Sequence, residues 1–244
     1  MTRVTRWDHE HPPRRGRAPD LAGIVRAAVA LADAGGIEAV SLRRVASVLG
    51  SGTATFYRVL NNRDELLDHM VDAVLGRHLP PVPSGEWRAD LAAVARNRRT
   101  MLTAHSWLGV HLAARPAIGP NALTHHDRAL AAAATYADDP TATSSAVETI
   151  FAYVLGATAR EQAEKQVRLR SGLTDGQWHA SVAPYLQQAL DTGAYPHLKQ
   201  MVETAVDLDA DTRFERGLSC VLDGLAAQRP DRRKVAGQQT STGR

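Results

Sequence analysis

The sequence predicts an all-α protein in which an N-terminal helix-turn-helix region is followed by a larger helical region. Three observations support this prediction. Apolar residues recur at helical spacing through most of the chain, and a short glycine-containing turn separates two helical patterns near residue 50. No stretch shows the strict apolar–polar alternation of a half-buried strand, and neither an internal repeat nor a glycine-rich phosphate-binding loop is present.

The composition is that of an ordinary globular protein. The 244 residues suffice for one large domain or two modest ones, and 44% of them are hydrophobic. A single cysteine excludes an intramolecular disulfide and suits a reducing cytoplasm. There is no long apolar run, and the N-terminus is polar and basic, so we expect neither a membrane span nor a secretory signal.

Residues 1–19 are predicted to form a disordered basic arm, because they are rich in proline and arginine and have no helical period. Arg14, Arg15 and Arg17 directly precede the first helical pattern. Two interpretations stay open for this arm. It is either a solubilising tail or a segment that follows the phosphates or enters the minor groove of a duplex.

Residues 20–78 are predicted to form the helix-turn-helix domain together with a linker helix. The first helix starts at Asp20, a good N-cap, and ends at Gly35-Gly36. A second helix starts after Ser41 and stops at Gly50, since glycine enters a left-handed conformation at no steric cost. Asn62 caps the linker helix, which runs to about residue 78 and stops before two prolines.

Between the second helix and the linker helix, a very short helix is expected to begin near Thr53. Two helices joined by so few residues cross steeply, and in that geometry the second one can enter a DNA major groove. Its outward side chains, Thr53, Ala54 and Thr55, are short enough to let the backbone approach the base edges. The alternative is an αα-corner inside a helical bundle, with no contact to DNA.

The charge distribution favours the DNA interpretation. Residues 1–63 contain ten arginines and only five acidic residues, whereas the chain as a whole has a net charge of +3. Positive charge concentrated around a helix-turn-helix is the electrostatic pattern of a nucleic-acid-binding surface. The residues predicted to contact DNA, through bases or phosphates, are Ser41, Arg43, Ser51, Thr53, Ala54, Thr55, Tyr57, Arg58 and Arg63.

Residues 79–228 read as helices throughout, after a proline-rich linker. The predicted helices span residues 86–104, 106–114, 121–136, 141–169, 175–192, 195–206 and 211–228. Proline, glycine and Asp-Pro breaks separate them. Residues 229–244 have no apolar period and are predicted to be a disordered tail.

Residues from about Asp20 to Leu75 resemble the N-terminal domain of the tetracycline-repressor (TetR) family. The resemblance lies in IVRAAVALADAGGIEAVSLRRVASVLG, the glycine turn, and TATFYRVLNNRDELLD. The second half resembles the regulatory half of the same family, which implies dimerisation and ligand sensing. The resemblance therefore implies a homodimeric transcriptional repressor that a small molecule releases from a palindromic operator, with no cofactor and no enzymatic activity.

Two alternatives belong to other functional classes. An all-helical enzyme is disfavoured because the chain has no nucleophile motif, no HExxH and no phosphate-binding loop. A ligand-independent DNA-binding protein would show no preferred site and would lose nearly all affinity at physiological salt.

Dimerisation also has a physical argument of its own. One short recognition helix buries little surface, whereas two related by a two-fold axis read half-sites about 34–36 Å apart. The helices predicted at 141–169 and 211–228 are the expected interface, packed with their mates as a four-helix bundle. The alternative is that their apolar stripes face only the core of their own chain.

The resemblance extends to the sensing region, where GVHLAARP resembles the drug-contacting segment of tetracycline-responsive members. His111 falls on a drug-contacting histidine, and Glu161 approximately matches an acidic residue of that site. Ala114 stands where those members have a threonine that helps to hold the drug's magnesium, which weighs against tetracycline–magnesium binding. The predicted ligand contacts are Met101, His105, Trp107, His111, Phe151, Tyr153 and Trp178, and the alternative is that each is ordinary core.

The ten histidines raise the question of a metal site. His125 and His126 are adjacent, so on a helix they point about 100° apart and cannot chelate one ion together. His105 and His111 are six residues apart, and Cys220 lies on an apolar stripe. Because none of these has the spacing of a zinc site, we predict no metal.

Overall fold

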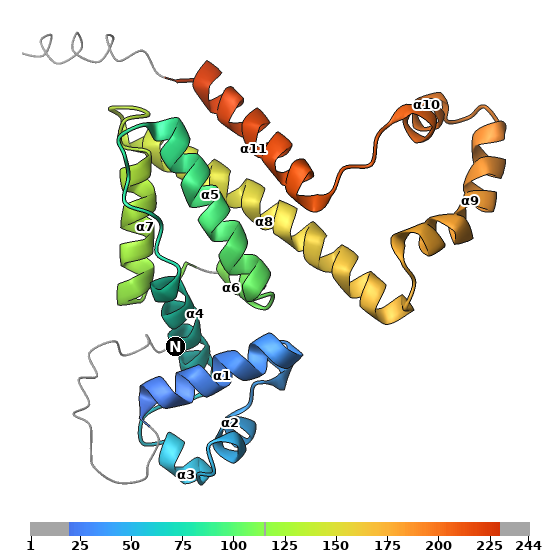
Figure 1. Cartoon of the computed structure of the whole chain (residues 1–244). Coiled ribbons are helices and arrows are strands. Elements are labelled where there is room, and N and C mark those ends of the chain that lie inside the picture. The colour runs from blue at the N-terminus through green and yellow to red at the C-terminus, as the bar shows by residue number, and fades with distance from the viewer. Residues whose placement is uncertain (1–19, 115, 230–244) are drawn as a thin grey trace, which may run out of the picture.

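The computed structural model describes residues 20–114 and 116–229, and every regular element in these ranges is a helix (Figure 1). The predicted all-α fold class is confirmed. The predicted basic arm at 1–19 and the predicted tail at 229–244, apart from Arg229, lie outside the described residues. None of the described helices combines the length and the apolar character needed to cross a membrane.

The first helices start and stop where local capping signals predict. They are α1 (Leu21–Gly35), the 3-10 turn η1 (Ile37–Ala39), α2 (Leu42–Val48), α3 (Thr53–Phe56) and α4 (Arg63–Arg77). Asp20 Oδ1 accepts a hydrogen bond from Gly23 N at 2.7 Å, and Ser41 Oγ accepts one from Arg44 N at 3.2 Å. Gly50 has a φ of +59°, which places it in the left-handed region that ends α2.

The cap of α4 includes a contact beyond the predicted Asn62 cap. Asn62 Oδ1 accepts a hydrogen bond from Glu65 N at 2.8 Å, as expected. Glu65 reaches back one residue further, to Asn61, whose backbone N and side-chain Nδ2 both donate to its Oε2, at 2.6 and 2.8 Å. The carboxylate therefore ties the turn after α3 to the start of α4.

The remaining helices form the second region. They are α5 (Trp87–Ala104), α6 (Leu108–Ala114), α7 (Pro120–Ala132), α8 (Pro140–Ser171), α9 (Asp175–Asp191), α10 (Pro196–Thr204) and α11 (Ala210–Ala227). The helix predicted to reach Tyr136 ends at Ala132 and is followed by turns. In this position Tyr136 packs edge-on against Trp87 and donates its hydroxyl proton to Leu225 O at 3.1 Å.

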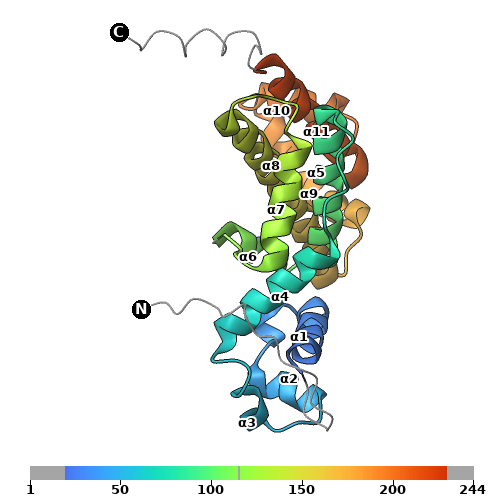
Figure 2. The same cartoon turned by 90° about the vertical axis from the view of Figure 1, so that its left-hand side faces the viewer.

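The linker helix α4 joins the two regions. It packs against α1 at one end and against α7 at the other, while α5 packs on α7 and α8. Figure 2 shows α3 at one extremity of the molecule and α4 between the helix-turn-helix and the bundle of α5, α7, α8 and α11. One connected core of buried side chains runs from α1 through α4 into this bundle.

The apolar stripes of the two predicted interface helices are turned inward. Val147, Ile150 and Val154 of α8, and Phe214 and Leu218 of α11, are all buried in the core of their own chain. α11 lies across α8 and α5. The periodicity that predicted an interface is therefore explained by intramolecular packing, and it does not by itself support a dimer.

Residues 172–209, which contain α9 and α10, form an arm that extends away from the bundle on the right of Figure 1. The two helices pack on each other. The arm exposes large apolar side chains, with 78% of Tyr185 and 82% of Val206 accessible to solvent. A single chain leaves this surface uncovered.

Candidate DNA-binding surface and sensing region

The short helix α3 presents small side chains at the tip of the molecule. Phe56 and Leu60 are buried in the hydrophobic core and anchor this segment, whereas Thr53, Ala54 and Tyr57 are exposed. Thr55 belongs to α3, but its side chain lies outside the described part of the structure. A helix held by one buried aromatic residue, with small polar residues outside, can approach the edges of base pairs.

Other residues predicted to contact DNA differ in how exposed they are and in whether they already form hydrogen bonds. Arg43 and Arg58 are exposed, and Ser51 is half-buried in the turn. Ser41 is exposed, but its hydroxyl oxygen already caps α2. The exposed arginines are positioned to reach phosphates on either side of a groove.

Arg63 is predicted to contact a phosphate, but in the structure its side chain also makes hydrogen bonds within the fold. Its Nε donates to Val40 O at 3.1 Å, and its Nη2 donates to Ile37 O at 3.0 Å. These bonds join the start of α4 to the loop that precedes α2. The side chain therefore holds the helix-turn-helix together, and its loss would act on DNA binding through the fold.

A carboxylate at the end of α1 links the DNA-binding helices to the second region. Asp33 Oδ1 lies 2.7 Å from His105 Nδ1 and accepts a hydrogen bond from Trp107 Nε1 at 2.8 Å. His105 follows the last turn of α5, and Trp107 precedes α6. Two residues that are predicted to contact a ligand, His105 and Trp107, therefore also bond to α1.

A second carboxylate links α4 to α7. Asp72 is buried, and it accepts hydrogen bonds from Asn121 Nδ2 at 2.8 Å and from Ala122 N at 2.9 Å. It thereby caps the first turn of α7 from a different helix. Gly76 permits the close approach of the two helices, since a Cβ there would lie 2.7 Å from Asn121 Cγ.

Asp72 and Asn121 were missed by the sequence analysis. The signal was an acidic residue, Asp72, on a helix whose neighbours Met70, Val71 and Val74 are buried. A carboxylate in that position needs a donor, but nothing in the sequence says which segment supplies it.

Among the described residues, only some of those predicted to contact a ligand lie side by side, and their role in ligand binding stays a prediction. His105, Trp107 and His111 lie close together, with ring centres 6.3 and 6.0 Å apart in turn. Tyr153 instead donates its hydroxyl proton to Phe214 O at 2.6 Å and supports the packing of α8 on α11. The others are equally dispersed: Met101 is fully buried, Phe151 lies against Arg98, and Trp178 lies on the arm.

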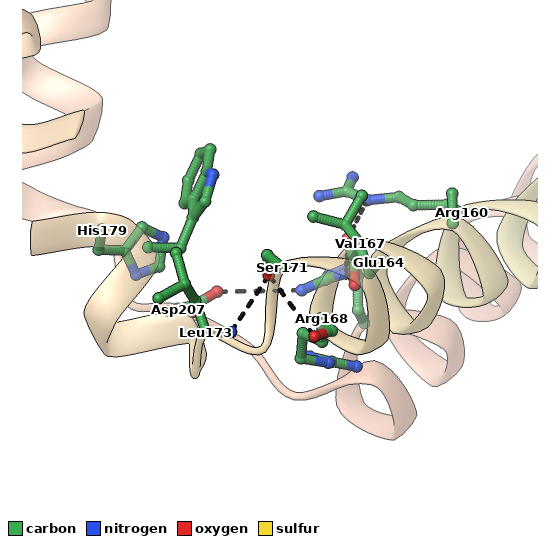
Figure 3. Close-up of a pocket in the computed structure, with 11 residues that line it drawn as sticks. Arg160, Glu164, Val167, Arg168, Ser171, Leu173, His179 and Asp207 are labelled. Carbon is green, nitrogen blue, oxygen red and sulfur yellow. Dashed lines mark hydrogen bonds and ion pairs between the residues drawn. The ribbon is translucent and has the colours of Figure 1, made fainter. Parts of the chain in front are cut away.

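Trp178 lines a separate cavity of about 460 Å³ between the end of α8, the start of α9 and the segment before α11 (Figure 3). Its size is in the range of small-molecule sites. Glu164 in its wall is paired with Arg160 at 2.8 Å and with Arg213 at 3.1 Å, so these charges are compensated within the chain. The cavity lies where the arm leaves the bundle.

His125 is a buried imidazole on α7. Burial lowers its pKa to about 4, and the positive charges of Arg98, His126 and His78 act in the same direction. His125 is therefore neutral at pH 7. Because its pKa in the unfolded chain is near 6.5, the unfolded state binds the proton first when the pH falls.

We expect this histidine to make the folded state less stable in acid. Its contribution is fully present above pH 6.5 and is lost as the pH falls towards 4, and over that window it amounts to about 3 kcal/mol. Urea unfolding at several pH values should show that His125→Gln removes this part of the pH dependence. His126→Gln, at an exposed neighbour, is the control, and equal acid sensitivity of the two variants would contradict the assignment.

Comparison with known proteins agrees with this architecture. The family model described as "Tetracyclin repressor-like, C-terminal domain" matches residues 79–229. The HTH-type transcriptional repressor DrrR1 of Streptomyces coeruleorubidus is 36% identical over 223 residues, which cover 90% of this chain and 82% of that protein. The tetracycline repressor protein class A from transposon 1721 of Escherichia coli is 29% identical, over 88% of this chain and 94% of that protein.

Solved structures extend the similarity to the fold. The TetR family protein ActR of Streptomyces coelicolor, in complex with actinorhodin, superposes with a TM-score of 0.72. It is 28% identical, and the match covers 87% of this chain and 99% of ActR. Together with the helix-turn-helix and the match over the second region, these similarities show that the chain is a regulator and not an enzyme. The chain belongs to the TetR family of transcriptional repressors.

Proposed function

We propose that this repressor binds a palindromic operator in the cytoplasm as a homodimer and is released when a polycyclic aromatic molecule binds its second region. The observation that carries this proposal is the pair of carboxylate links between the regions. Asp33 ties α1 to the α5–α6 junction, and Asp72 ties α4 to the start of α7. Movement of α5–α7 would therefore be transmitted to the helices that position α3.

The physical mechanism is a population shift. A ligand that favours one arrangement of α5, α6 and α7 changes the positions of His105, Trp107 and Asn121. The carboxylates bonded to these residues carry α1 and α4 with them. In a dimer this changes the separation of the two α3 helices, so that the half-site spacing no longer matches. A coupling of about 1–3 kcal/mol is typical of such linkage.

Dimerisation is supported by the arm. The apolar side chains of the arm, among them Tyr185 on α9 and Val206 after α10, are exposed in one chain, and a surface of this kind usually has a partner. Two copies would also supply the two recognition helices that an operator with two half-sites requires. We therefore include the arm, along with α8 and α11, in the proposed interface.

The ligand class is proposed from a solved relative and from Ala114, which differs from the threonine of tetracycline-responsive members. ActR was solved with actinorhodin, and this chain matches nearly its whole length. Ala114 lacks the hydroxyl that the resemblance associates with magnesium-bound tetracycline, so the proposed ligand binds without a metal.

Selection of binding sites from random duplexes by the full chain tests the proposal. We expect enrichment of a palindrome whose half-sites lie about one helical turn apart, at physiological salt. Release of the selected duplex should then be measured with polycyclic aromatic compounds. Binding of all duplexes alike, with affinity lost at physiological salt, would contradict the proposal and indicate a non-specific binder.

A further inference from the structure

Arg98 is a buried cation that forms no ion pair with any residue that the structure describes. It lies on α5, only 8% of it is exposed, and its buried Nε has no hydrogen-bond partner. No described residue forms an ion pair with the guanidinium, whose Cζ lies 3.8 Å from the centre of the Phe151 ring on α8. The stacking orients the group, but it leaves the buried Nε–H without an acceptor.

The charge of Arg98 is retained despite burial. Burial lowers its pKa to about 10, and the negative charge of the exposed Glu148 partly opposes this change. The guanidinium is therefore protonated at neutral pH. A buried charge is normally paired, so an unpaired one indicates a partner that is supplied from elsewhere.

Other arginines of α5 and α11 that are not fully exposed to solvent have carboxylate partners, whereas the buried Arg98 forms no ion pair with a described residue. Arg96 pairs with Glu215 at 2.7 Å, and Arg99 pairs with Glu161 at 3.0 Å. Arg213 on α11 pairs with Glu164 at 3.1 Å. Within the described residues, the neighbours of Arg98 on α5 therefore have carboxylates at ion-pair distance, and Arg98 has none.

A second buried group without a partner lies beside the same ring. His125 on α7 has a buried Nε2 with no hydrogen-bond partner, and its ring centre lies 6.3 Å from that of Phe151. Since His125 is neutral at pH 7, its imidazole can donate a hydrogen bond without adding charge. Arg98 and His125 thus approach Phe151 from α5 and α7, the helices whose movement the proposed function requires.

We propose that Arg98 binds an acidic group of the effector, a carboxylate or an ionised phenol, with His125 as a second donor. This inference rests on the proposed function and specifies the chemical class of its ligand. A guanidinium forms two parallel hydrogen bonds with a carboxylate, and a site already closed to water strengthens them. No internal ion pair has to be broken, so the acid gains a partner that the free protein lacks.

A matched pair of compounds tests the charge preference on the full chain. Anthraquinone-2-carboxylate and anthraquinone-2-carboxamide have the same ring system and nearly the same shape, and only the first is anionic. By calorimetry we expect the carboxylate to bind at least ten-fold more tightly than the carboxamide. Arg98→Met should abolish this preference, whereas Arg98→Lys should keep part of it and Arg96→Met, at an exposed paired arginine, all of it.

Thermal unfolding of the free proteins separates a ligand contact from a structural one. Arg98→Met keeps most of the side-chain volume and removes an unpaired charge, so its melting temperature should equal or exceed that of the wild type. A large fall in melting temperature would indicate a structural role and overturn the proposal. Equal affinity of the wild type for the two compounds, or no binding of either, would overturn it without any variant.

Operator release by the same compounds distinguishes this inference from the proposed function. If the carboxylate binds through Arg98 but leaves the operator bound, the Arg98 site is supported, and the proposed release by this class of ligand is contradicted. If the carboxamide releases the operator as well as the carboxylate does, the proposed release by a ligand is supported, and the proposed contact of Arg98 with an acidic group is contradicted.

Discussion

Replacing Asp72 with alanine is expected to lower the free energy of unfolding by about 2–4 kcal/mol and to weaken the effect of a ligand on operator binding. The carboxylate is buried and accepts hydrogen bonds from Ala122 N and Asn121 Nδ2. Its removal leaves a buried backbone N–H at the start of α7 unsatisfied. It also cuts the link through which α7 moves α4, so both stability and coupling should fall.

Urea unfolding at equal protein concentration measures the first effect, and operator titrations with and without ligand measure the second. Asp127→Ala removes an exposed carboxylate from α7 and is the matched control. Asp72→Asn should be intermediate, since it keeps an acceptor for Ala122 N but places an amide next to Asn121. If the Asp72→Ala variant is as stable as the Asp127→Ala control, the hydrogen bonds between Asp72 and the start of α7 do not contribute to stability.

Tyr57→Ala is expected to reduce operator affinity roughly ten-fold or more while leaving the folded state intact. The side chain is 62% exposed beside α3, so its removal takes little from the core. If its hydroxyl binds a phosphate, the affinity loss should be similar for all sequences, whereas Thr53→Ala should change which base pairs are preferred. Binding titrations over a range of salt concentrations, with specific and random duplexes, separate the two effects.

Arg63→Ala, on the same predicted DNA-binding surface, is expected to affect the fold as well, unlike Tyr57→Ala. Because Arg63 donates to Val40 O and Ile37 O, its loss should lower thermal stability as well as DNA affinity. Leu123→Ala, an exposed change on α7, should alter neither property. Unchanged operator binding by Tyr57→Ala would show that the proposed docking of α3 is wrong.

Much of the helical framework was predictable because its determinants are local. Asp20, Ser41 and Asn62 each accept a hydrogen bond from an amide three residues later. Gly50 adopts the left-handed conformation at the end of α2. Such interactions span a few residues, so the residue types are enough to indicate where a helix begins or ends.

The candidate site was less predictable because its contacts join distant segments. His105 and Trp107 bond to Asp33, more than seventy residues earlier, and the sequence did not predict this contact. A polar aromatic residue on a helix has the same sequence pattern whether it faces a ligand, a core or another helix. Nothing local distinguishes these cases.

By itself, the sequence determined the order of the helices, the position of the helix-turn-helix and the family. Capping, helical period and turn conformation depend only on residues that are a few positions apart in the chain. Only the tertiary structure decided which charges are satisfied. It gave Asp72 and Arg63 internal partners, turned the stripes of α8 and α11 inward and left Arg98 without an ion pair to any described residue. Those outcomes depend on which helices meet, and that is set by the packing of the whole chain.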